Sequence, residues 1–157
     1  MKIYILGFFV ASLSLTSAVA QEYKIVTTVE SIVPMGVGRS RMVDPQGAAN
    51  YRELTTERTD GKKSSQGDVK REDVKIDNFE ETKLLNFYSA VGINFQNIAS
   101  NDAVVSSKLT ELANEGWTLM HVTSGVESDA GAHDGTGIFI TRYIFKRDNQ
   151  TVAAPAK

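Results

Sequence analysis

The last third of the chain limits the fold most, because one helix and two apolar strands follow one another there without interruption. The predicted helix carries an apolar stripe at helical spacing, formed by Val105, Leu109 and Leu112. Asn101 is expected to cap its start. Gly116 is expected to end it in a left-handed conformation, with Trp117 folding back against the last apolar turn in a Schellman closure.

The strands of this region are predicted over 117–126 and 138–147, separated by a segment rich in glycine and aspartate. Both are apolar on both faces, which is typical of central strands that are covered on each side. An earlier strand is predicted from Tyr23 to Val33, where Pro34 ends it. These elements predict an α+β fold, in which one main helix packs on an antiparallel sheet.

The middle of the chain gives weaker signals. Residues 34–46 contain several glycine and proline residues and are predicted to form a loop. Residues 51–59 are interpreted as an exposed strand that turns at Asp60-Gly61. The apolar residues of 79–90 fit a short helix or a strand, because periodicity does not decide over so short a run. The interpretation favours a helix over 79–90, followed by a strand-like piece over 93–98.

The first twenty residues have the layout of a secretory signal peptide. Lys2 precedes an apolar run that ends at Ala18-Val19-Ala20, so cleavage is expected after Ala20. The run is too short for a membrane-spanning helix. The processed protein is therefore expected to be periplasmic or secreted, and the complete absence of cysteine favours a bacterial periplasm.

Removal of these 20 residues from the 157 leaves 137, which suits one domain. The domain is predicted over 21–147, with 148–157 as a frayed tail. Lys2 is the only charge removed, so 16 basic residues face 19 acidic ones and the net charge is −3. This balance argues against nucleic acid as a partner. No second apolar segment predicts membrane insertion after cleavage.

The chain also resembles a family of small bacterial domains of unknown function, whose members follow the pattern YKVV … EGWELV … YLFKR. The similarity rests on Tyr23-Lys-Ile-Val26, on Glu115-Gly-Trp117 and on Tyr143-Ile-Phe-Lys-Arg147. It implies a β-α-β-β core, here with a long insertion over 34–100. The family has no known activity that could be transferred to this chain. The resemblance implies that the basic pair Lys146-Arg147 is a solvated strand end.

One candidate site is the loop 127–135, which combines Asp129, His133 and Asp134 with several glycines. Carboxylates and an imidazole can bind a divalent cation. However, the spacing does not match an EF-hand, no second histidine completes a zinc set, and the same residues commonly form turns. His121 is expected to be a packed or half-exposed strand residue rather than a base.

A second candidate is the segment from Gly36 to Arg41, where Gly36 and Gly38 precede Arg39 and Arg41. A glycine-rich backbone with two guanidinium groups can hold a carboxylate or phosphate. The segment lacks the ending of a phosphate-binding P-loop. The competing interpretation is a structural loop, whose arginines pair with acidic residues of the protein itself.

The sequence therefore predicts a non-enzymatic binding or structural module of the bacterial cell envelope, without a cofactor. Its partner is an unidentified protein or small ligand, and a homo-oligomer is one expected form. The alternative is a small metal-assisted hydrolase that uses the 127–135 loop.

Overall fold

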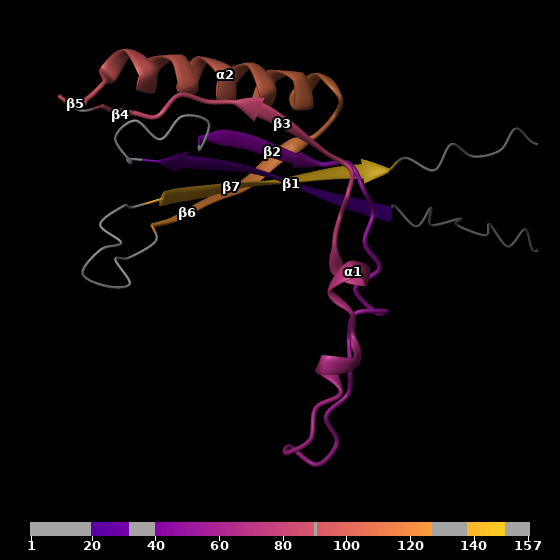
Figure 1. Cartoon of the computed structure of the whole chain (residues 1–157). Coiled ribbons are helices and arrows are strands. Elements are labelled where there is room, and N and C mark those ends of the chain that lie inside the picture. Colours follow the sequence, from indigo (N-terminus) through magenta and orange to yellow (C-terminus); the bar gives the residue numbers. More distant parts are fainter. Residues whose placement is uncertain (1–19, 32–39, 90, 127–137, 150–157) are drawn as a thin grey trace, which may run out of the picture.

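The computed structural model describes residues 20–31, 40–89, 91–126 and 138–149. Its main feature is a five-stranded antiparallel sheet in the order β3-β2-β1-β7-β6, with the long helix α2 (Phe95–Asn114) lying across one face (Figure 1). The strands are β1 (Ala20–Ser31), β2 (Arg41–Pro45), β3 (Phe79–Lys83), β6 (Thr118–Val126) and β7 (Ile138–Asn149). The predicted α+β class is confirmed, with β1, α2, β6 and β7 forming its β-α-β-β core.

The sheet is built around β1 and β7, which pair over the full length of both strands. Successive residues of a strand point to opposite faces, and this alternation is clear in β1. Val26 and Thr28 face α2 and are buried, whereas Ile25 on the other face is 44% exposed. β7 lies between β1 and β6, so it is an interior strand, as the sequence predicted.

The same prediction is wrong for β6. This strand is one of the two edge strands of the sheet, and all nine of its residues are exposed. Its apolar composition on both faces indicated a covered strand, but among the described residues it has a neighbour on one side only, β7.

The hydrophobic core lies between α2 and the sheet. Its buried members are Val26, Met42, Leu84, Leu112, Trp117 and Phe145. They come from both ends of the described chain, so removal of their apolar surface from water joins β1, β2, α2 and β7 into one unit. Among the residues that the structure describes, no helix has the length and apolar character needed to cross a membrane.

Helix α2 starts earlier than expected. Asn94 is its cap, and its side chain accepts a hydrogen bond from the backbone N–H of Asn97 at 3.1 Å. The prediction that Asn101 caps the helix is wrong, because Asn101 is buried within α2. Its amide accepts from the backbone N–H of Leu85 and donates to the Leu85 carbonyl and to the Glu30 carboxylate, at 2.7–2.8 Å.

The predicted end of α2 is confirmed. Gly116 has φ +87°, the Trp117 N–H donates to the Leu112 carbonyl at 2.9 Å, and the Gly116 N–H donates to the Ala113 carbonyl at 3.1 Å. Leu112 and Trp117 are both buried, as the Schellman closure requires. This closure turns the chain directly from α2 into β6.

Several expectations for the middle of the chain are wrong. Residues 41–45 form strand β2 rather than a loop. Residues 79–90 hold β3 and the short strand β4 (Tyr88–Ser89), not a helix, because β3 pairs with β2 along its whole length. Over 93–98, only Ile93 belongs to a strand, β5 (Gly92–Ile93), before α2 begins.

Residues 46–78 form an arm that projects away from the sheet (Figure 1). At its base, the backbone N–H groups of Gln46 and Gly47 donate to the Asn78 carbonyl. The arm contains a single 3₁₀ turn (η1, Gln66–Asp68) and a four-residue helix (α1, Arg71–Val74). The strand expected over 51–59 is absent from this described segment, which consists of turns and irregular chain.

The Asp60-Gly61 turn does form at the tip of the arm. The backbone N–H groups of Lys63 and Lys62 donate to the Asp60 carboxylate at 2.8 and 2.9 Å, and these bonds lower the pKa of Asp60. Gly61 has φ +69°, which glycine adopts readily. At the other end of the domain, β7 includes Asp148 and Asn149, which were expected to belong to a frayed tail, and the rest of that segment lies outside the described residues.

Candidate functional site

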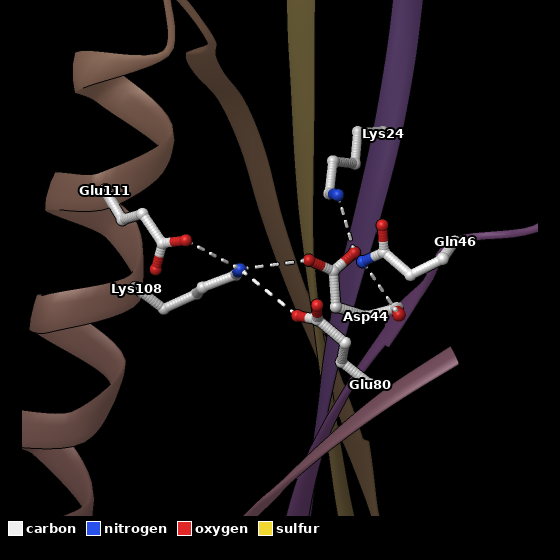
Figure 2. Close-up of polar contacts among 6 residues, drawn as sticks. All are labelled: Lys24, Asp44, Gln46, Glu80, Lys108 and Glu111. Atoms are coloured by element: carbon white, nitrogen blue, oxygen red, sulfur yellow. Dashed lines mark hydrogen bonds and ion pairs between the residues drawn. The ribbon is translucent and has the colours of Figure 1, made fainter. Parts of the chain in front are cut away.

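A buried carboxylate lies under α2 at the edge of the core. Asp44 points from β2 toward the helix and is only 2% exposed. Lys24 of β1 reaches its Oδ1 atom at 2.7 Å, and Lys108 of α2 reaches its Oδ2 atom at 3.1 Å (Figure 2). A buried charge is tolerated only when it is paired, and here two ammonium groups pair with one carboxylate.

Lys108 also approaches two further carboxylates, as Figure 2 shows. Its Nζ atom lies 3.5 Å from Glu111, one turn along the helix, and 3.9 Å from Glu80 of β3. Burial alone lowers the pKa of Lys108, but the hydrogen bond and charge of Asp44, together with Glu111, outweigh it and raise the pKa. Ion pairs of this cluster therefore link α2 to β2 and β3 directly, and to β1 through Asp44.

This cluster predicts a loss of stability in alkaline solution. The raised pKa of Lys108 stabilises the fold below its ordinary value of 10.5, and this contribution disappears as the pH rises through the folded-state pKa. Burial raises the pKa of Tyr143 above 10.0, so the unfolded chain loses that proton first and stability again falls with pH. We expect the free energy of unfolding, measured with urea, to change little below about pH 10 and to fall as the pH rises further.

Two variants separate these contributions. Lys108→Met should make the fall less steep, and Tyr143→Phe should do so independently, because each removes one titrating group whose pKa differs between the folded and unfolded chain. If both variants keep the slope of the original protein, these groups do not control its alkaline stability.

Next to the Asp44 cluster lies a surface cleft of about 580 Å³. Its lining is Glu22, Tyr23, Lys24 and Ile25 of β1, Pro45 at the end of β2, Gln46 to Ala49 at the start of the arm, Glu115, Trp117 and Arg147. Lys24 thus belongs to both features. The volume is within the range of about 300–1,000 Å³ that is usual for ligand pockets.

Arg147 forms one end of this cleft. Its guanidinium lies 4.3 Å from the centre of the Trp117 ring, and its Nη2 atom is 2.8 Å from the Glu22 carboxylate. A weaker bond at 3.4 Å runs from Nη1 to the Glu115 carbonyl. Arg147 is therefore a packed residue that joins β7 to β1, and the expectation that it is a solvated strand end is wrong.

The cleft exists because β2 is shorter than β1. β1 pairs with β7 from Ala20 to Ser31, but it pairs with β2 only from Thr27 to Val29. After Pro45 the chain turns away into the arm. Within the described part of the chain, the edge of β1 from Ala20 to Val26 that faces the cleft consequently pairs with no strand, although the other edge is fully paired.

Arg41 is the one predicted site residue that the structure describes, and it does not line this cleft. Arg41 is in β2 and forms a 2.6 Å ion pair with Glu81, beside a small surface hollow of about 200 Å³. Arg39, Asp129, His133 and Asp134 lie outside the described residues, and so does the loop of the proposed hydrolase. His121 is exposed in β6. No group of three histidine, aspartate or glutamate side chains suited to a metal occurs in the described segments.

The sequence interpretation missed Asp44, Lys24 and Lys108. They come from three separate elements, and no spacing in the sequence connects them. The one local signal is Met42-Val-Asp44, where the carboxylate shares the buried face of a strand with an apolar residue. An acidic residue on the core side of a strand indicates a partner cation elsewhere in the chain.

No protein-family model and no curated protein matches this chain. The resemblance to the bacterial domains of unknown function stays a prediction.

Proposed function

We propose that this chain is a non-enzymatic binding protein that works outside the cytoplasm and takes an extended peptide into the cleft as an added strand along β1. The observation that carries the proposal is the edge of β1 from Gln21 to Val26, which pairs with no strand on the side of the cleft. An extended peptide gains main-chain hydrogen bonds at such an edge, and pockets for alternate side chains give specificity.

The charges around the cleft favour this mode of binding over recognition of a free ion. Lys24 pairs with Asp44, and Arg147 pairs with Glu22, so both cations that line the cleft already have carboxylate partners in the protein. A small anion would have to displace one of them. A peptide backbone instead uses the strand edge, while its side chains contact Ile25 and the rim of Trp117.

The proposed location outside the cytoplasm rests on the signal peptide predicted from the sequence. The expected cleavage point after Ala20 falls at the first residue of β1. Processing there leaves Gln21 as the first residue and keeps every β1 residue that lines the cleft.

The proposal is tested by tryptophan fluorescence, because Trp117 is the only tryptophan of the chain and it lines the cleft. The probe is a capped five-residue peptide of alternating valine and threonine, both of which favour extended backbone. We expect a saturable change in emission, with a dissociation constant between about 1 µM and about 1 mM.

Two matched variants locate the binding. Ala48→Tyr fills the cleft and should weaken binding at least tenfold, or about 1.4 kcal/mol. Ala103→Tyr makes the same change at an exposed position of α2 and should bind like the original protein. No fluorescence change at about 1 mM peptide, or equal binding by both variants, contradicts the proposed site.

A further inference from the structure

β6 has the properties of a strand that pairs with another strand. It is the last strand of the sheet, and its outward edge has no neighbour among the described residues. On the face that carries α2, Leu119 is 42% exposed, Val122 45% and Val126 58%. The one irregularity in its pairing with β7 lies between Leu119 and His121, so the ladder from His121 to Val126 is regular.

The two edges of the sheet differ in how they are protected. Natural edge strands avoid unwanted pairing by being short, by carrying charges or by containing proline. β3, at the opposite edge, has five residues and includes Glu80, Glu81 and Lys83. β6 has nine residues, TLMHVTSGV, with no aspartate, glutamate, lysine, arginine or proline.

The composition of β6 favours a second copy of this chain as its partner. When two identical strands pair antiparallel, a two-fold axis relates them, so every charged residue occurs on both strands. Like charges directly opposite one another in such a pair are destabilising. β6 contains no aspartate, glutamate, lysine or arginine, so it does not incur this penalty. Two copies of β3 would bring several carboxylates together.

We propose that the protein forms a two-fold dimer in which the β6 strands of two copies pair antiparallel and join the two sheets into one of ten strands. A register centred on Ser124 places Val122 of each copy opposite Val126 of the other. Both valines lie on the face of α2, because their partners in β7 are Tyr143 and Phe139. Cross-strand pairs of β-branched residues stabilise such a ladder.

This dimer is independent of the peptide cleft, since β7 separates β6 from β1. Failure of one proposal therefore leaves the other intact. Analytical ultracentrifugation of the purified protein should give twice the mass of one chain at about 100 µM. Val122→Lys places two like charges near the axis and should give the monomer at that concentration. Thr82→Lys, a matched change on β3, should remain dimeric.

A disulfide tests the register directly, because the chain has no cysteine of its own. Ser124→Cys places two thiols opposite one another across the axis, so oxidation should yield a covalent dimer at least tenfold faster than for Thr82→Cys. Ser124→Cys also keeps the proposal testable if Val122→Lys does not fold. A monomer at about 1 mM, or equal rates of crosslinking for the two cysteine variants, overturns the proposal.

Discussion

Replacing Asp44 by asparagine is expected to lower the free energy of unfolding by about 3 kcal/mol. The change keeps the shape of the side chain but leaves Lys24 and Lys108 without their shared carboxylate, and both ammonium groups are largely buried. Lys108 keeps Glu111 and Glu80 nearby, but Lys24 loses the carboxylate with which it pairs. Uncompensated charge in a buried place is among the costliest single changes in a protein. Urea unfolding at neutral pH, followed by circular dichroism, measures the effect.

The matched control is Glu81→Gln, which also removes one carboxylate of an ion pair. Its side chain is 44% exposed, and that of its partner Arg41 is 40% exposed, so water replaces the lost charge. We expect a loss below about 1 kcal/mol. Equal losses for Asp44→Asn and Glu81→Gln would show that burial of the Asp44 cluster has no energetic importance.

Joint replacement of the three charges should recover most of the loss. A variant with Asp44→Leu, Lys24→Met and Lys108→Met buries no charge, and such replacements of buried ion pairs are often neutral or stabilising. Recovery in this variant would indicate that the cost of Asp44→Asn comes from unpaired ammonium groups rather than from a change in packing.

Leu112→Ala is expected to destabilise the fold by about 2–5 kcal/mol. Leu112 is 1% exposed, belongs to the core, and accepts the Trp117 N–H at the end of α2. Truncation leaves a cavity beneath the closure, so we also expect the emission of Trp117 to shift to longer wavelength as water reaches the ring. Urea unfolding gives the energy, and native-state fluorescence reports the exposure.

Leu85→Ala provides the comparison for this core substitution. Leu85 precedes α2 and its side chain is 39% exposed, so the same truncation removes less buried surface and should cost below about 1 kcal/mol. A loss for Leu112→Ala as small as that for Leu85→Ala would mean that the helix end is not anchored in the core.

The parts of the fold that follow from local signals could be predicted from the sequence. Gly116, with Leu112 before it and Trp117 after it, specifies the end of α2 within a few residues. The segment 79–90 could not be predicted in this way. Its short apolar run fits two structures, and the outcome is decided by pairing of β3 with β2, which lies more than thirty residues earlier.

The position of β6 was a similar difficulty. An apolar strand is consistent with an interior position in the sheet or with an edge position where another chain pairs with it. Only the strand order distinguishes these positions. The cleft also depends on strand order, because it lies beside the part of β1 that extends beyond its pairing with the shorter strand β2. No sequence motif at Lys24 or Arg147 indicates that these residues line a cleft, because the position of each is set by the strand that contains it.

The most direct measurement is amide hydrogen exchange of β1, with and without the alternating valine–threonine peptide. If the peptide adds as a strand, the amides of residues 22–26 that face the cleft become protected, whereas those already bonded to β7 change little. Protection confined to another part of the molecule, or no change in β1 at a saturating peptide concentration, would contradict the account.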